Sequence, residues 1–123
     1  MLIGSFLTGT QFRKGRKIKQ MMAYIHEHYS EKISISELAA AAYLSERECF
    51  RVFHDCLHMT PAEYMKSCRL QAASRMLAYG QEPVTVIGHA CGLGSSSYFG
   101  KVFRAYAHCT PTEYRAKWQD SDI

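Results

Sequence analysis

Two arginines four residues apart, Arg47 and Arg51, are the side chains of this sequence whose type and spacing best suit a specific chemistry. On an α-helix, residues four apart lie on the same face. A guanidinium group can donate two parallel hydrogen bonds to O6 and N7 of guanine, which discriminates against another base by roughly 1–3 kcal/mol. Phe50 lies between them and could contact a thymine methyl group or pack against a neighbouring helix. The group therefore indicates a surface that could read base edges, provided that a helix carries it.

The reactive side chains do not indicate a metal site or a catalytic site. His54 and His58 are four residues apart and close to Cys56, but His58 is expected at a helix end and no second ligand pair follows. A cysteine–histidine nucleophile would need an orienting acid and an oxyanion site, which the sequence does not supply. We therefore expect no metal, no cofactor and no enzymatic activity.

The stretch that carries the two arginines occurs twice. Residues 38–64 return as residues 87–114, with Phe53 corresponding to Phe103. The second copy has one extra residue just after Leu93. A repeat of this length indicates one structural unit that is used twice.

Capping signals predict a helix-turn-helix motif in the first copy. Ser34 and Glu37 form a capping box before an alanine-rich helix at residues 38–42, and Ser45 and Glu48 form a second box that opens the next helix. Two boxes so close together indicate a short helix, a tight turn and a second helix. The small alanine side chains allow the two helices to cross closely.

The apolar periodicity predicts an all-α fold of about seven helices. The expected helices are residues 17–29, residues 38–42, a helix opened by Ser45, a long helix from Thr60 to Gly80, residues 84–91, residues 96–106, and a last helix from Thr110 through Trp118. The expected organisation is a flexible arm or linker remnant at 1–16, a first helix-turn-helix subdomain at 17–60, a linking helix at 61–80, a second subdomain at 81–119 and a tail at 120–123.

The composition fits a folded globular domain. The 123 residues carry a net charge of +4, and 47% of them are hydrophobic. No apolar run approaches the roughly 20 residues that a membrane span needs. The five cysteines are odd in number and include no CxxC pair, so free thiols in a reducing cytoplasm are expected. The basic run at residues 13–19 could bind phosphate or form a solvated face, and the composition leaves both open.

Three motifs carry a resemblance to a known family. They are LAAAA-x-LS-x(4)-F-x-x-F from Leu38, RL-x-AA-x-x-ML from Arg69 and CGL-x-SSSYF-x-KVF from Cys91. In these motifs the chain resembles the DNA-binding domain of AraC/XylS-type bacterial transcription regulators. The resemblance implies two helix-turn-helix subdomains joined by a rigid helix, with two recognition helices in successive major grooves of double-stranded DNA. It also implies regulation of transcription, commonly activation through RNA polymerase, and a sensor or dimerisation domain that this chain lacks.

The expected DNA contacts follow from this resemblance and from the apolar faces of the two recognition helices. The expected base-contacting residues are Arg47, Phe50, Arg51, Ser96, Ser97 and Lys101. The expected backbone-contacting residues are Glu46, His54, Ser95, Gly100 and Arg104. The residues expected to pack inward are Cys49, Val52, Phe53 and Cys56 in the first motif, and Tyr98, Phe99, Val102 and Phe103 in the second. Because serine bonds many acceptors and glycine none, we expect the second helix mostly to bond phosphates and the first to supply specificity.

The sequence departs from the family pattern at its turns. Tyr43 stands where the family has a turn glycine, whereas the second motif keeps Gly92. His58 and His108 replace the glycine usual before Thr-Pro, and histidine tolerates the left-handed conformation better than most residues. Gly88 stands where the family prefers alanine, which should weaken its helix by up to about 1 kcal/mol.

Alternative roles stay open for several of these residues. The serine run at residues 95–97 could act only as a helix cap. Glu46 could accept a hydrogen bond from a cytosine amino group or simply stabilise the helix dipole. The alternative function is a helical protein-interaction module without DNA affinity, in which methionines form a groove instead of a core. Those methionines are Met21, Met22, Met65 and Met76.

Overall fold

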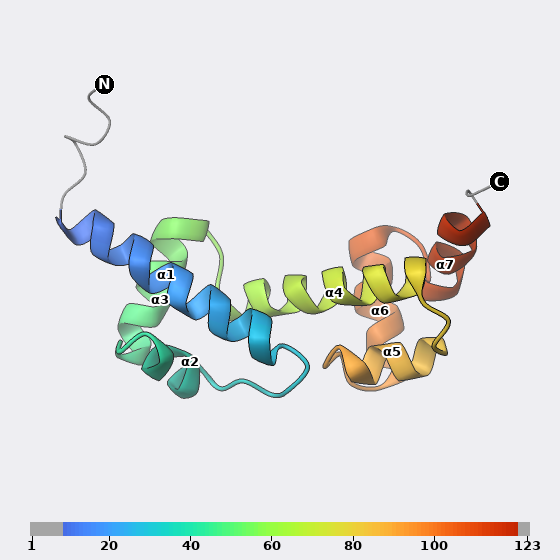
Figure 1. The fold of residues 1–123 in the computed structure, drawn as a ribbon, viewed down its shortest axis with the longest axis horizontal. Coiled ribbons are helices and arrows are strands. Elements are labelled where there is room, and N and C mark those ends of the chain that lie inside the picture. Colours follow the sequence, from blue (N-terminus) through green and yellow to red (C-terminus); the bar gives the residue numbers. More distant parts are fainter. Residues whose placement is uncertain (1–8, 121–123) are drawn as a thin grey trace, which may run out of the picture. The chain divides into compact units, whose positions relative to one another are not determined.

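The structure, a computed structural model, describes residues 9–120, which form seven α-helices and no strand (Figure 1). The helices are α1 (Gly9–His28), α2 (Ile35–Ala41), α3 (Glu46–Leu57), α4 (Pro61–Tyr79), α5 (Val84–Ala90), α6 (Ser96–Ala107) and α7 (Pro111–Asp120). The predicted all-α fold is confirmed. Within the described stretch, no helix is both long and apolar enough to cross a membrane.

Side-chain caps form at the four capping residues that the sequence predicts, although α2 begins at Ile35 rather than at Leu38. In each cap the hydroxyl accepts from the backbone N–H three residues later, while the glutamate there accepts from the N–H of the capping residue. The four pairs are Ser34 with Glu37, Ser45 with Glu48, Thr60 with Glu63 and Thr110 with Glu113. Since each cap needs only residues three apart, these starts are set locally.

The start of α1 differs from the prediction. α1 begins at Gly9 rather than Lys17, so residues 9–16, expected as part of a flexible arm, are helical. The rest of that arm lies outside the described residues. Within this segment Lys14 donates a hydrogen bond of 2.6 Å to Asp55 of α3. This contact joins residues that are 41 apart in sequence, so local spacing could not reveal it.

Contacts divide the chain into two compact units. Among the described residues, the first unit holds residues 9–28 and 33–64, and the second holds residues 29–32 and 65–120. The linking helix forms as predicted, but the division falls inside it, between Tyr64 and Met65. The predicted subdomain limits at residues 60 and 81 therefore do not coincide with the limits of the compact units. At the C-terminal end, Asp120 closes α7, and the rest of the expected tail lies outside the described residues.

Arg69 explains why residues 29–32 belong with the second unit. Its Nε donates to the carbonyl oxygen of Tyr29 at 2.7 Å, and its Nη2 donates to that of Glu31 at 2.9 Å. Burial lowers the pKa of this guanidinium, which nonetheless stays charged because an arginine pKa is very high. One side chain of α4 therefore holds the segment that follows α1.

Each unit has its own apolar core. The first buries one face each of α1, α2 and α3, including Met21, Ile25, Leu38 and Phe53. The core of the second contains Leu70, Ala72, Ala73, Leu77, Ile87, Cys91, Leu93, Phe99 and Phe103. Met65 is also buried, and Met76 packs against the second core. At least these methionines serve as core residues rather than as an open groove.

α7 closes the end of α4. The side-chain amide of Gln119 donates to the carbonyls of Leu77 and Gly80 at 3.1 and 2.9 Å, and Arg115 Nε donates to Leu77 at 3.3 Å. Carbonyls in the last turn of a helix lack partners within the helix, so these bonds satisfy them. Arg115 looks like a surface cation in the sequence but is half-buried and structural.

Candidate nucleic-acid interface

α3 is a short helix fixed at both ends. At its start, Ser45 Oγ accepts from the N–H of Glu48 at 3.1 Å, and the Glu48 carboxylate accepts from the N–H of Ser45 at 3.0 Å. At its end, His58 adopts the predicted left-handed conformation, with φ of 56°, and donates its N–H to the His54 carbonyl at 3.0 Å. Both ends are therefore defined by bonded caps, which fixes the direction of every side chain between them.

The two faces of α3 divide as the sequence predicts. Cys49, Val52 and Phe53 are buried, and Cys56 is half-buried. The five candidate contact residues are all exposed: Glu46, Arg47, Phe50, Arg51 and His54. Phe50 keeps 46% of its surface accessible, so it is not a core residue of this unit. The exposed face combines two guanidinium groups, one carboxylate, one aromatic ring and one imidazole.

Cations of α1 pair with the acids of α3. Arg13 lies 3.9 Å from the Glu48 carboxylate, and Lys14 lies 2.6 Å from that of Asp55. The hydrogen bond from Lys14 lowers the pKa of Asp55, with a further contribution from His54. The pKa of Glu48 is lowered mainly by its bonds to Ser45. Both acids are therefore ionised at neutral pH and partly neutralised by α1.

This pairing is a feature that sequence reasoning missed. The sequence alone leaves two roles open for the basic run at residues 13–19, phosphate binding and a solvated face. In the structure Lys17 donates to the carbonyl of Ala42 at 2.7 Å and lies 5.5 Å from the ring centre of Tyr43. Part of the run therefore holds α1 against α2 and α3, whereas Arg16 and Lys19 are exposed. No local signal marks these partners, because they lie 25 to 41 residues away.

α6 starts with a one-sided cap. Ser95 Oγ accepts from the N–H of Tyr98 at 3.3 Å, but tyrosine has no carboxylate to return the bond. The first turn of α6 contains no acidic residue. His108 ends the helix in the left-handed conformation, as predicted, with φ of 64°. The start of α6 is thus less anionic than that of α3.

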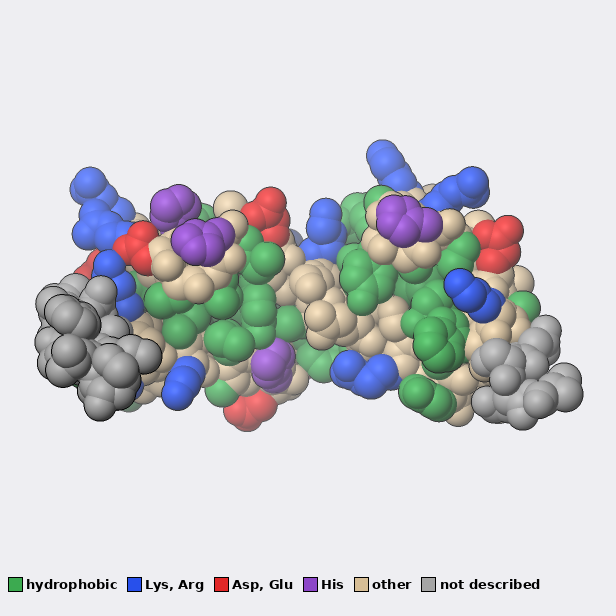
Figure 2. Space-filling model, turned by 90° about the horizontal axis from the view of Figure 1, so that it is seen from above, with side chains coloured by type: hydrophobic (Ala, Val, Ile, Leu, Met, Phe, Trp, Pro, Cys, Tyr) green, Lys and Arg blue, Asp and Glu red, His purple; other side chains and the backbone are tan. Residues whose placement is uncertain are grey.

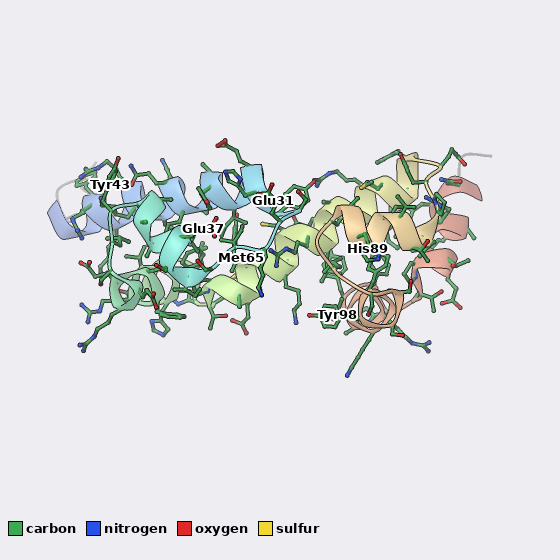
Figure 3. The ribbon with its side chains drawn as sticks, turned by 90° about the horizontal axis from the view of Figure 1, so that it is seen from below. Glu31, Glu37, Tyr43, Met65, His89 and Tyr98 are labelled. Atoms are coloured by element: carbon green, nitrogen blue, oxygen red, sulfur yellow. The ribbon has the colours of Figure 1, made fainter. Side chains whose placement is uncertain are left out.

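The exposed face of α6 matches the prediction with one correction. The candidate residues Ser95, Ser96, Ser97, Lys101 and Arg104 are exposed, and Gly100 is half-buried with open space around its Cα. Tyr98 was expected to pack inward but is 49% exposed (Figure 3). The reason is that Phe99 and Phe103 already fill the inward face, and Tyr98 is turned by about 100° from Phe99 around the helix.

The turns before α3 and α6 show why one needs glycine. Tyr43 has φ of 58° and is 83% exposed, so its side chain extends into open space (Figure 3). Gly92 has φ of 77°, and a Cβ there would lie 2.7 Å from the carbonyl oxygen of Tyr29. The extra residue of the second copy is Gly94, with φ of 73°. The second turn is therefore confined by the backbone beside it.

The surface of each unit carries basic side chains. Figure 2 shows Lys and Arg side chains standing out from each unit, with His side chains near them. Among the described residues, no group of three or more His, Cys, Asp or Glu side chains could hold a metal ion. The cysteines are free thiols, as predicted, and burial raises the pKa of Cys49 to about 11. The interface therefore offers hydrogen bonding and positive charge.

Comparison with known proteins identifies relatives of this architecture. A family model described as a helix-turn-helix domain matches residues 38–117. The chain is 36% identical over 102 residues to the uncharacterised HTH-type transcriptional regulator YdeC of Bacillus subtilis (strain 168), covering 83% of this chain and 35% of YdeC. It is 32% identical over 99 residues to the HTH-type transcriptional activator RhaS of Enterobacter sp. (strain 638), covering 80% of this chain and 36% of RhaS. The chain spans about a third of the length of these curated relatives.

Two solved structures share the fold. A transcriptional regulator with an AraC-type DNA-binding domain from Chromobacterium violaceum superposes with a TM-score of 0.81 at 27% identity, covering 84% of this chain and 92% of that one. The DNA-binding domain of AdpA, a global transcriptional factor in complex with a target DNA, superposes with a TM-score of 0.80 at 27% identity. That match covers 85% of this chain and 95% of the AdpA domain.

Proposed function

This chain belongs to the AraC/XylS family of helix-turn-helix transcription regulators, and from that premise we propose that it binds a specific sequence of double-stranded DNA and thereby regulates transcription. The observation that carries the proposal is the repeated arrangement of α3 and α6. Each is the second helix of a helix-turn-helix motif, buries one face and exposes a face of polar and basic side chains. A helix so presented fits the major groove of B-DNA.

The two helices divide the work of recognition. α3 reads bases, because Arg47 and Arg51 can each bond guanine bidentately and Phe50 can contact a thymine methyl group. α6 binds more weakly and with less choice of sequence, since it offers Ser96, Ser97 and Lys101. Phosphate contacts come from His54 on α3, from Ser95 before α6, and from Gly100 and Arg104 on α6. The start of a helix also offers backbone N–H groups to a phosphate. Glu46 lies in the first turn of α3, where its carboxylate can accept a hydrogen bond from a cytosine amino group or stabilise the helix dipole. A phosphate would repel it, because both groups are negatively charged.

Activation through RNA polymerase is the mode of regulation that we propose, and it is supported by the RhaS relatives, whose names describe activators. The remaining two thirds of the relatives' length suggests that a sensor or dimerisation domain accompanies this domain. Because the proposed partner is double-stranded DNA, we propose a cytoplasmic location for this role.

Selection from random duplexes followed by sequencing tests the proposal. The expected result is an enriched motif whose affinity falls by several orders of magnitude when salt rises from about 50 to about 200 mM, because binding releases phosphate counterions. A shuffled duplex of equal length is the control. Recovery of no motif, together with no duplex affinity at low salt, would favour the helical protein-interaction module instead.

A further inference from the structure

His54 is the exposed end of a bonded chain that begins on α1. Its side chain is 81% exposed near the end of α3, and its Nδ1 lies 3.3 Å from Oδ1 of Asp55. The other oxygen of that carboxylate, Oδ2, accepts a hydrogen bond of 2.6 Å from Nζ of Lys14. Lys14 therefore holds Asp55, and Asp55 holds the imidazole.

The carboxylate decides what the imidazole can offer to DNA. An ionised carboxylate only accepts hydrogen bonds, so Nδ1 of His54 must carry the proton that faces Asp55. A neutral imidazole has a single N–H, which leaves Nε2 as an acceptor. A phosphate oxygen is also an acceptor. Neutral His54 in this orientation therefore has no donor for a phosphate, whereas the protonated form donates through Nε2.

The internal repeat supports a phosphate role for this position. The residue of α6 equivalent to His54 is Arg104, which is exposed and always charged. The residue equivalent to Asp55 is Ala105, so α6 has no carboxylate there. The same position thus carries a permanent cation in one motif and a titratable, carboxylate-held cation in the other.

We propose that Lys14 and Asp55 are positioning residues that hold His54 for a protonation-dependent contact with a DNA phosphate. The first motif then binds DNA more tightly as the pH falls through the range in which histidine titrates, whereas Arg104 binds its phosphate equally across that range. This inference rests on the proposed DNA binding and adds to it a regulated contact and two residues that do not touch DNA.

The groups around His54 are compatible with this behaviour. On α3 they are Arg51 one turn earlier, Asp55, Cys56 and His58, whose ring centre lies 6.3 Å from that of His54. From α1 the facing group is Lys14. The pKa of Asp55 is lowered and that of Cys56 is raised, mainly by burial, so the carboxylate stays ionised and the thiol neutral near neutral pH. A variant of His54 separates its contribution from that of His58.

Binding of the selected duplex at about pH 6 and about pH 8, on either side of the ordinary histidine pKa, tests the proposal. Relative to His54→Ala, the wild-type chain should gain about two- to fivefold in affinity at the lower pH, as expected for one exposed ion pair. Its plot of log K against log salt should steepen by about 0.9, which corresponds to one added phosphate contact.

Variants of the positioning residues give the sharper readout. Asp55→Ala and Lys14→Met should lose this pH-dependent gain, and Asp55→Asn, which keeps the size of the side chain, serves if Asp55→Ala does not fold. Arg104→Ala is the matched control, because it should weaken binding at both pH values and keep the difference between them. Glu27→Ala removes an equal charge from an exposed position on α1 and should also keep it.

The outcomes separate the two levels of the proposal. If the wild-type chain binds no duplex at either pH, the proposed function fails. If it binds, but His54→Ala keeps the full pH dependence, the phosphate contact of His54 is wrong. If His54→Ala loses the pH dependence while folded Asp55→Ala or Asp55→Asn keeps it, the positioning role of the carboxylate is wrong.

Discussion

The two helix-turn-helix motifs follow one plan but fix their second helices by different means. α3 is held by charges, with Glu48 closing the cap at Ser45 and α1 supplying cations to its acids. α6 has Tyr98 at the position equivalent to Glu48, and its preceding turn is confined at Gly92 by neighbouring backbone. The first motif therefore relies more on ionic contacts, whereas the turn of the second is confined by close packing.

The pairs of residues where the two helices of each motif meet show the same contrast. Ala39 and Cys49 are buried at equivalent positions to Gly88 and Phe99. In the first motif, alanine on the first helix is paired with a small cysteine on the second. In the second motif, glycine on the first helix is paired with a large phenylalanine ring on the second. A Cβ at Gly88 would lie 2.9 Å from the Phe99 ring. The glycine therefore has a packing reason that helix propensity alone does not reveal.

The turn residues should give the largest difference between the motifs. Gly92→Ala should destabilise the chain by about 2–4 kcal/mol, because alanine pays for the left-handed conformation and its Cβ meets the carbonyl of Tyr29. Tyr43→Ala should change stability by less than about 1 kcal/mol, since that side chain is exposed in open space. Urea unfolding of both variants measures the contrast, and equal losses would contradict it.

The packing pairs should give the next largest effect. Gly88→Ala should destabilise by about 1–3 kcal/mol, because the buried Phe99 must move. Gly15→Ala is the control, since nothing lies within 4 Å of its added Cβ, and it should stabilise α1 by about 0.5–1 kcal/mol. Thermal unfolding measures both.

A second background tests the cause of the Gly88 effect. In a Phe99→Leu chain, the cost of Gly88→Ala should shrink, because the smaller side chain leaves room for the new methyl group. An undiminished cost would show that contact with the ring is not responsible, and the contrast between the two pairs would lose its physical basis.

The fold was largely predictable, because its signals are local. Ser45 and Glu48 predict the start of α3, because the bonds of their capping box join residues only three apart. The buried and exposed faces of the helix follow from its period of 3.6 residues. The start of α1 at Gly9 was not predictable, because the apolar period of that helix is clear only from Lys17 on, and the contact of the earlier segment through Lys14 with Asp55 spans 41 residues. The exposure of Tyr98 also depends on which neighbour fills the core.

For the candidate site, too, the sequence predicts the local features but not the contacts between distant residues. The exposed positions of α3, including Arg47 and Arg51, follow from the periodicity and are confirmed as exposed. Their contacts with DNA stay predictions. Asp55 could not be found as a site residue, because a sequence shows a carboxylate beside His54 but not the lysine that orients it.

Recognition itself should differ between the helices. Arg51→Ala should flatten the preference for one base pair of the selected motif by about 1–3 kcal/mol. The equivalent change in α6, Lys101→Ala, should cost less preference at any one base pair, because α6 is expected to choose less among sequences, and should lower the salt slope by up to about 0.9, because it removes one cation that faces DNA. Sequencing of the duplexes selected by each variant measures the difference. If Arg51→Ala left affinity and preference unchanged, α3 would not be the reading helix.

The helix caps should give the smallest effect. Bonds from Ser45 lower the pKa of Glu48 below its ordinary value of 4.5, so the folded state favours the ionised form. A carboxyl group with a lowered pKa adds stability above its unfolded pKa and loses it as the pH falls through the folded value. The stability difference between the wild-type chain and Glu48→Gln should therefore be constant near neutral pH and shrink below about pH 4.5.

The second motif supplies the control for this cap, since Tyr98 stands in place of Glu48 and has no carboxyl group. Tyr98→Phe should show no pH-dependent difference from the wild-type chain between about pH 3 and about pH 7, because the substitution removes no carboxyl group. Chemical unfolding at a series of pH values compares the two substitutions directly. A Glu48→Gln difference that persisted unchanged at acid pH would mean that the charge of Glu48 does not stabilise α3, and that the two motifs are capped equally well by their serines alone.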